Sequence, residues 1–271
     1  MLRVGEALNI DQIILAIEAE QYDFEPTLRI PGLKEIRNEE IILRLSEGSS
    51  SVFSNKVVRS VFTSDADEKN SKMIDFYGTK RKNFSWWIGP KSQPDDLSLR
   101  LESKGFTLED VYIGLAISVQ QAPSFKKSDW TVKEALTEPE LRNHVSINAE
   151  VWGMDSASIE ASIREKMSYV SLPGRRGGYI VAYHNTGLPI GNGTYRISSD
   201  GQTMYLIGSA VLPEYRNKGV YHSLLQYRIN KSKEEGCQLL TVQARLGTSE
   251  PILRRIGFKE YCKFQMFVKS F

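Results

Sequence analysis

The sequence predicts an α+β (α/β) protein with two domains, each built on a mixed, mostly antiparallel sheet flanked by helices. Its 271 residues are long for one compact domain and comfortable for two. A short polar run at 120–124 separates two halves that each contain strand and helix patterns. In the second half these patterns follow the order β-α-α-β-β-β-α-β-α-β, which combines a meander with crossover helices. We therefore expect one domain at residues 1–125 and a second at residues 126–271.

The first half begins with a helical pattern. Residues 11–22 place apolar side chains at helical spacing, and the acidic residues among them are foreign to the apolar core of a signal peptide. Trp86 and Trp87 are adjacent, so in a strand they would face opposite sides of the sheet. We favour core packing for both, with one of them lining a cleft as the alternative. The other expected elements of this half are a short helix at 39–45, a strand at 57–62, an exposed loop at 63–71, a helix at 73–82, a strand at 84–88, a helix at 93–104 and a strand at 111–119.

Turn and capping residues delimit the elements of the second half. We expect hairpin turns at 185–187 and 199–201, and the Asp-Gly pair in the latter is a strong hairpin signal. Pro213 ends a strand because proline cannot donate to a β ladder. Gly236 ends a helix. The expected strands are 130–135, 178–184, 190–197, 203–212, 239–243 and 261–268, and the expected helices are 138–152, 156–170, 220–235 and 249–256.

Composition and charge exclude several classes of protein. Hydrophobic residues make up 41% of the chain and charged residues 25%, which is ordinary for a globular protein in water. The net charge of +2 gives no basis for a nucleic-acid or membrane-surface partner. No apolar run approaches the roughly 20 residues that cross a bilayer. Cys237 and Cys262 are too few for a disulfide framework and lack metal-site spacing. We therefore expect a cytoplasmic protein with reduced thiols, no metal site, and neither a nucleic-acid nor a membrane partner.

The turn at 216–221 joins an apolar strand to a helix. A helix start exposes four unpaired N–H groups and carries about half a positive charge. Gly219 lets the main chain approach an anion closely, and Arg216 and Lys218 add positive charge. The spacing alone favours an ordinary solvated turn, whereas the surrounding sequence favours an anion site.

The strand before this turn and the turn itself resemble the acetyl-CoA-binding core of the GNAT superfamily of N-acetyltransferases. In that family a strand ends in V-x-P and is followed by Q/R-x-x-G-x-G/A and a helix. Val211 and Pro213 match the strand end, and Arg216 and Gly219 match the first two signature positions. Tyr221 replaces the last glycine or alanine of the signature. A tyrosine at this position would either crowd the pyrophosphate or stack on the cofactor.

A second signature strengthens the resemblance, which covers about residues 128–271. The segment 249–258 is similar to the family's helix closed by Gly-Phe. The resemblance implies acetyl-CoA as the cofactor, with its pantetheine arm along the strand and its pyrophosphate on the amides of the turn. The residues implied in cofactor binding are Ser209, Ala210, Val211, Arg216, Asn217, Lys218, Gly219, Val220, Tyr221 and His222.

The first half resembles a degenerate half of a tandem GNAT protein. Residues 84–90 and the segments that follow them carry this resemblance, and Gly105-Phe106 is similar to Gly257-Phe258. The phosphate-turn signature is missing from residues 57–80. We expect a lobe that binds no cofactor and shapes the acceptor cleft, with a separate structural domain of another kind as the alternative.

The groups that would transfer protons are less evident. Many family members protonate the thiolate with a tyrosine about four residues before Gly-Phe, and here Leu253 stands at that position. Some members carry a carboxylate early in the strand before the phosphate turn, and the matching place here is near Tyr205. Our candidate substitutes are Tyr205, Tyr221 and His222, with a capping or surface role as the alternative for His222. Water can also mediate the deprotonation of an amine.

The resemblance therefore implies an acetyl-CoA-dependent N-acetyltransferase in which an amine attacks directly in a ternary complex. We expect the acceptor to be a small-molecule or peptide amine, which the sequence does not identify. The alternative is a non-catalytic acyl-CoA-binding or interaction protein, for which Leu253 and the missing carboxylate argue. The absence of a G-x-x-x-x-G-K-[ST] run argues against a nucleoside triphosphate site.

Overall fold

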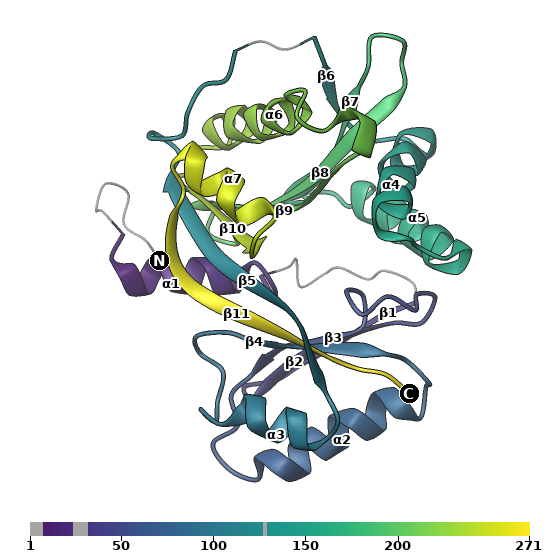
Figure 1. Ribbon diagram of the computed structural model, residues 1–271, viewed down its shortest axis with the longest axis vertical. Coiled ribbons are helices and arrows are strands. Elements are labelled where there is room, and N and C mark those ends of the chain that lie inside the picture. Colours follow the sequence, from purple (N-terminus) through teal and green to yellow (C-terminus); the bar gives the residue numbers. More distant parts are fainter. Residues whose placement is uncertain (1–7, 24–31, 127–128) are drawn as a thin grey trace.

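The computed structural model describes residues 8–23, 32–126 and 129–271 (Figure 1). The strands in these ranges form one sheet of 11 strands in the order β1-β2-β3-β4-β11-β5-β10-β9-β8-β7-β6. Neighbours are antiparallel except for the pairs β3–β4 and β9–β10, which are parallel. The expected α+β class, with a mixed and mostly antiparallel sheet flanked by helices, is confirmed.

Strands and helices alternate along most of the chain. The strands are β1 (Leu33–Arg37), β2 (Ile41–Ser46), β3 (Lys56–Ser60), β4 (Phe84–Ile88), β5 (Thr107–Ser118), β6 (Thr131–Glu134), β7 (Gly177–Tyr183), β8 (Pro189–Ile197), β9 (Thr203–Val211), β10 (Leu239–Arg245) and β11 (Lys259–Lys269). The helices are α1 (Ile10–Ala19), α2 (Ala66–Gly78), α3 (Leu97–Ser103), α4 (Glu138–Trp152), α5 (Ser156–Val170), α6 (Val220–Glu234) and α7 (Ser249–Ile256), with a short 3-10 helix at Pro213–Tyr215. Within the described ranges, none of the helices is both long and apolar enough to span a bilayer.

Three segments of the first half differ from the sequence prediction. Residues 39–45 contribute to strand β2 rather than a helix, because this short apolar run is buried on both faces of the sheet and its pattern does not separate the two structures. Helix α2 begins at Ala66, inside the expected loop, with Asp67 and Glu68 in its first turn, where the helix dipole favours acidic side chains. Strand β1 has no counterpart among the expected elements, since most of its residues are exposed and show no alternation.

Strands β5 and β11 join the two halves of the molecule. Strand β5 ends the first half of the chain, yet it lies between β10 and β11 of the second half. Strand β11 ends the chain and also pairs with β4 of the first half. In Figure 1 both strands run from the upper group of elements into the lower group. Each half therefore places one strand in the sheet of the other, and the sheet is continuous.

The two halves repeat one pattern of elements. The order β3-α2-β4-α3-β5 corresponds to β9-α6-β10-α7-β11, and in each case the strands around the longer helix are parallel. Gly105 and Gly257 follow the short helices with φ of 80° and 109°. Phe106 and Phe258 come next and are buried. The similarity between the two Gly-Phe pairs is thus also a similarity of structure.

Helices cover both faces of the C-terminal part of the sheet. A Cβ added to Gly191 of β8 would meet Val220 and Leu224 of α6. The next residue, Asn192, instead donates to the main-chain carbonyl of His144 in α4 at 2.6 Å. Adjacent strand residues face opposite sides, so α6 and α4 lie on opposite faces. Figure 1 shows α4 and α5 on one side of β8 and α6 on the other.

Helix α1 packs on the same face as α4, farther along the sheet. Its Ile17 is buried in a cluster with Leu239 of β10, whereas the next residue, Leu240, belongs to the core beneath α6. Trp87 lies in the cluster with Ile17, and Trp86 lies in the core of the first half. Both tryptophans are therefore core residues on opposite faces, as expected.

Candidate functional site

Strands β9 and β10 separate partway along their length. They pair only where residues 203–205 lie opposite residues 239–241. Beyond this point β9 stays with β8, and β10 stays with β5. A bulge between Ile207 and Ser209 falls at the divergence, and Gly208 there has a φ of 47°, which favours glycine. We call the divergence of these two strand edges the splay.

Main-chain groups of β9 line one edge of the splay. The N–H of Ala210 turns toward β8 and bonds to Oδ1 of Asn192 at 3.1 Å. Main-chain groups alternate in direction along a strand, so those of Ser209 and Val211 face the splay. Nε of Arg216 donates to the Val211 carbonyl at 3.2 Å. Of the three residues implied in binding the pantetheine arm, two therefore present main-chain groups to the splay and one faces away.

The turn that starts α6 follows directly from this edge. Asn217 and Gly219 have φ of 61° and 80°, and the helix begins at Val220. Gly219 is the N-cap residue and provides no side-chain cap. Among the described residues, the main-chain N–H groups of 217–222 find no hydrogen-bond acceptor. A Cβ added at Gly219 would meet nothing within 4 Å, so the space in front of these donors is open.

Side chains hold the turn before α6 in place and give it positive charge. Nε1 of Trp130 donates to the carbonyl of Lys218 at 2.8 Å. The ring of Tyr215 stands edge-on to Trp130 at 6.2 Å, and Nζ of Lys218 lies 5.5 Å from the same ring. Arg216, Asn217 and Lys218 are exposed. The turn thus combines free donors, the positive end of a 15-residue helix and two cations, a set that fits the diphosphate of acetyl-CoA.

The three candidate proton-transfer residues do not come together. Tyr205 is buried, and its hydroxyl donates to Oδ2 of Asp23 at 2.9 Å. Burial, and then the Asp23 charge, raise the pKa of Tyr205 well above its usual range. Tyr221 lies in the first turn of α6 and packs against the core under this helix. Burial raises its pKa, and Arg228 opposes the shift. His222 is exposed, and its ring stacks on Phe125 at 4.5 Å.

An acidic segment that no sequence motif indicates reaches the splay from the end of α1. Glu20 accepts the main-chain N–H of Gln243 in β10, and Asp23 accepts the Tyr205 hydroxyl and the N–H of Ser199. These contacts join residues 223, 182 and 176 positions apart. The only local signal is that acidic residues follow an amphipathic helix, and this signal does not indicate which strands they meet.

The position of the usual family tyrosine lies inside the core. Leu253 on α7 is fully buried in the cluster beneath α6 and α7. Its side chain neither donates nor accepts a proton, as the sequence indicates. Any proton transfer at this site must therefore use another group or water.

In the first half, β3 and β4 correspond to β9 and β10, and residues just beyond these strands pair with each other. Val61, just beyond β3, forms a parallel bridge with Gln93. The N–H of Gln93 donates to the Ser60 carbonyl at 3.0 Å, and the N–H of Phe62 donates to the Gln93 carbonyl at 3.1 Å. In the first half, main-chain groups therefore pair with each other across the divergence, which β9 and β10 do not do beyond residues 205 and 241.

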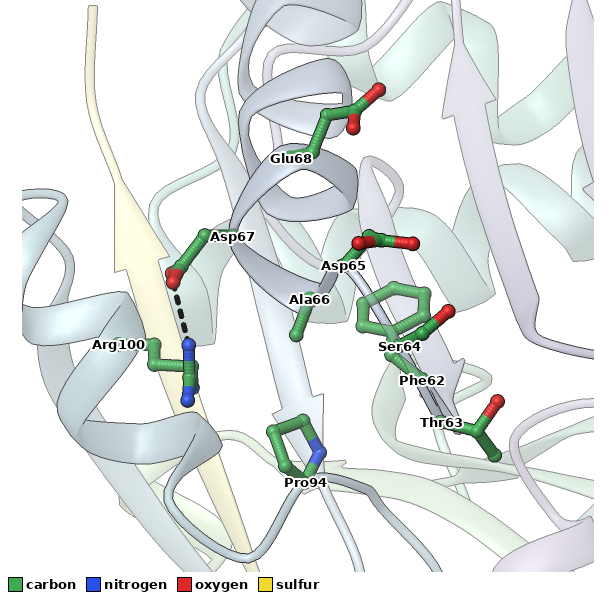
Figure 2. Close-up of a pocket in the computed structure, with 9 residues that line it drawn as sticks. All are labelled: Phe62, Thr63, Ser64, Asp65, Ala66, Asp67, Glu68, Pro94 and Arg100. Atoms are coloured by element: carbon green, nitrogen blue, oxygen red, sulfur yellow. Dashed lines mark hydrogen bonds and ion pairs between the residues drawn. The ribbon is translucent and has the colours of Figure 1, made fainter.

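The turn that starts α2 is also acidic. A hollow of about 430 Å³ lies beside it, and Asp65, Asp67 and Glu68 are among the residues that line it (Figure 2). Asp67 pairs across this hollow with Arg100 at 2.5 Å. Carboxylates at this helix start repel a phosphate, which agrees with the missing phosphate-turn signature.

Comparison with a family model defines the C-terminal part of the chain. Residues 146–258 match the model of the acetyltransferase (GNAT) family. The match runs from α4 to the Gly-Phe pair after α7 and includes both the splay and the α6 turn. The chain thus contains a GNAT acetyltransferase domain at these residues. No curated protein matches the chain.

Solved structures share the fold over most of the chain. A functionally unknown conserved protein from Staphylococcus epidermidis is 15% identical with a TM-score of 0.66, and the match covers 90% of this chain and 96% of that one. A tandem GNAT protein from the clavulanic acid biosynthesis pathway is 12% identical with a TM-score of 0.59, covering 99% and 89%. A GCN5-related N-acetyltransferase from Kribbella flavida is 14% identical with a TM-score of 0.59, covering 88% and 90%. The fold is therefore that of a tandem GNAT protein.

Proposed function

We propose that this protein is an acetyl-CoA-dependent N-acetyltransferase in which an amine attacks the thioester directly in a ternary complex. The observation that carries the proposal is the continuity of two features. The unpaired N–H groups of residues 217–222 lie at the end of the open edge of β9. A diphosphate bound at the turn and an amide-containing arm along the strand would use both features at once.

Each part of the site has a role in this proposal. The main-chain N–H groups of 217–222 donate to the diphosphate, and Arg216 and Lys218 add charge. Main-chain groups of Ser209 and Val211 pair with the pantetheine arm. When bound, acetyl-CoA supplies the acetyl group as a thioester. We place the acceptor on the face of the sheet covered by α1 and α4.

The wider setting is part of the same proposal. The acceptor is a small-molecule or peptide amine, without a nucleic-acid or membrane partner. Residues 126–271 hold the cofactor, and residues 1–125 shape the acceptor side and exchange a strand with them. Cys237 and Cys262 are free thiols, which suits a cytoplasmic location.

Calorimetry with acetyl-CoA on wild type and Gly219→Pro tests the cofactor site. Proline removes a donor and cannot adopt the φ of 80° found at this position, so we expect affinity to fall by about 10²-fold or more. Gly236→Pro is the matched control, because Gly236 ends the same helix with a φ of 73° and open space around it. Thermal unfolding checks that both variants fold. Equal affinity of wild type and Gly219→Pro would refute the site.

The alternative function is a non-catalytic acyl-CoA-binding or interaction protein. The burial of Leu253 at the usual proton-donor position favours it. Release of thiol from acetyl-CoA with a panel of primary amines separates the two functions. Sustained turnover with any amine excludes the inert protein, whereas acetyl-CoA binding without turnover supports it.

A further inference from the structure

Glu20 lies at the edge of β10 that faces the splay. Its Oε2 accepts the main-chain N–H of Gln243 at 3.1 Å. Two residues beyond Thr241, the last residue of β10 that pairs with β9, this N–H has no strand partner. The alternation of the strand agrees with this direction, since the N–H of Leu239 also faces the β9 side and bonds to the Gln202 carbonyl at 3.2 Å. Glu20 thus caps the open edge across the splay from the bulge in β9.

Thr241 provides a second, independent observation beside Glu20. Its hydroxyl is fully buried and has no hydrogen-bond partner among the described residues. The side chain of Gln243 bonds to α1, and residues two apart share a face, so Thr241 also faces the α1 side. Tyr205 lies opposite Thr241 in the register of the two strands. A buried hydroxyl without a partner is costly, and Thr241 thus adds a second polar group beside Glu20 on the α1 side of β10.

Hydrogen bonds among α1, β10 and β3 hold the end of α1, next to Glu20, in place. Nε2 of Gln243 donates to the carbonyl of Ile17 in α1 at 3.0 Å, and Nε2 of Gln21 donates to Oε1 of Gln243 at 2.7 Å. Nζ of Lys56 in β3 donates to Oε1 of Gln21 at 2.9 Å. The end of α1 is therefore held against β10 by groups from both halves of the chain. Such support keeps the carboxylate oriented without the substrate.

The surroundings of Glu20 favour its protonated form. Burial raises its pKa to about 8, and the Gln243 N–H and the Lys56 charge oppose the shift. Burial lowers the pKa of Lys56 to about 7. The other titratable groups that interact with Glu20 are Tyr205 of β9 and Cys262 of β11, and burial raises the pKa of both. A carboxyl group with a pKa near the working pH suits proton transfer.

We propose that Glu20 accepts the proton of the acceptor amine, on the face of the sheet covered by α1. This inference rests on the proposed function and names a residue for it. The ammonium form of the acceptor gives one proton to the Glu20 carboxylate, and the freed electron pair of nitrogen forms the C–N bond to the acetyl carbon. The C–S bond breaks, the thiolate leaves with the electron pair of that bond, and it takes up the second nitrogen proton by way of water. The first half of the chain thus supplies the carboxylate that β9 lacks at Tyr205.

The test compares Glu20→Gln with Glu18→Gln, using thiol release from acetyl-CoA with n-butylamine. Glutamine keeps an oxygen for the Gln243 N–H but accepts no proton, so we expect kcat to fall by about 10²-fold or more. Acetyl-CoA affinity and thermal stability should stay unchanged. Glu18 is the matched control, because it is a buried carboxylate of the same helix that accepts the Lys91 N–H at 3.1 Å, away from β10. We expect Glu18→Gln to retain wild-type kcat.

Two further readouts distinguish proton transfer from a structural role. Methoxyamine is largely unprotonated at neutral pH, so Glu20→Gln should lose much less activity with it than with n-butylamine. In the free protein, a ¹³C titration of the glutamate carboxyl groups should show a midpoint at about 8 that is absent from Glu20→Gln. If Glu20→Gln does not fold, the wild-type titration decides, and the absence of any midpoint near 8 overturns the assignment.

The outcomes separate this inference from the proposed function. Equal turnover by wild type and Glu20→Gln with n-butylamine overturns the role of Glu20 and leaves N-acetyltransfer standing. A loss of equal size with both amines also overturns it, because proton acceptance predicts a smaller loss with methoxyamine. Acetyl-CoA binding by wild type without thiol release from either amine overturns both proposals.

Discussion

The two strand-to-helix turns of this molecule occupy the same position in the repeated fold and have opposite charge. The α2 turn places Asp65 at the N-cap and Asp67 and Glu68 in the first helical turn. The α6 turn places Gly219 at the N-cap, with Lys218 before it and no acidic residue in the first turn. A helix N-terminus attracts negative charge. In the first half the chain supplies that charge itself, whereas the first turn of α6 contains no acidic side chain that could do so.

The strand edges beside these turns differ in the same sense. In the first half Val61 and Gln93 form a bridge, so main-chain donors and acceptors at this edge pair with each other. In the second half β9 and β10 part after Tyr205 and Thr241, and the Glu20 side chain accepts the Gln243 N–H at the open edge of β10. The fold therefore does not by itself leave main-chain donors open to an anion. The proposed cofactor site depends on a few residues that leave such donors unpaired among the described residues.

Reversing the charge of the α6 turn should remove the electrostatic difference between the two turns and have the largest effect. The double variant Arg216→Glu and Lys218→Glu gives the second half the electrostatics of the first. We expect acetyl-CoA affinity to fall by about 10²-fold, because two cations beside the diphosphate become anions. Calorimetry at two salt concentrations measures it. The loss should shrink at high salt, since both side chains are exposed.

The mirror-image change in the first half is the control for this variant. Asp65→Lys with Asp67→Lys makes the α2 turn basic, yet the bridge from Val61 to Gln93 still occupies the strand edges. We therefore expect acetyl-CoA affinity and stoichiometry to stay at wild-type values. A second equivalent of bound acetyl-CoA would mean that charge alone distinguishes the two turns.

The pH dependence of stability tests the protonation of Glu20 at the open edge of β10. We expect a smaller effect here than from the charge reversal. The pKa of Glu20 rises from 4.5 to about 8 on folding, so between these values the native state binds more protons than the unfolded state. The free energy of unfolding must then fall as pH rises through this window. Lys56, whose pKa falls to about 7, contributes the opposite sign above pH 7. In Glu20→Gln, the decrease in the free energy of unfolding between pH 5 and pH 8 should be smaller than in wild type by on the order of 1–3 kcal/mol. Urea unfolding at the two pH values measures it. Identical slopes in both proteins would place the pKa of Glu20 at its ordinary value.

The sequence predicts the second half of the fold well because its signals are local. Helix α4 was expected at its observed bounds, since Thr137 and Glu140 form a capping box and Gly153 ends the helix. The α6 turn was also found from neighbouring residues, Arg216 to Gly219. These features require no knowledge of distant strands.

The rest of the molecule depends on contacts that no local pattern contains. Strand β2 is buried on both faces, so its apolar run does not show the alternation of a strand. Strands β5 and β11 each pair with strands of the other half, and no local pattern in either strand indicates this pairing. Glu20 meets Gln243, 223 positions away, only because α1 packs across β10. The sequence near the signature therefore does not indicate a proton-transfer group, since Leu253 stands at the usual position.

The smallest expected effect concerns how each turn is held. In the first half the bond from the Phe62 N–H to the Gln93 carbonyl ties the turn into the sheet, whereas in the second half the Trp130 side chain holds the Lys218 carbonyl at 2.8 Å. Trp130→Phe removes this donor and keeps an aromatic ring against Tyr215. We expect acetyl-CoA affinity to fall by about fivefold, the equivalent of one hydrogen bond of about 1 kcal/mol, measured by calorimetry. Trp152→Phe is the control, because Trp152 is exposed at the end of α4. Unchanged affinity in Trp130→Phe would mean that the main chain of this turn holds its donors in place without side-chain support.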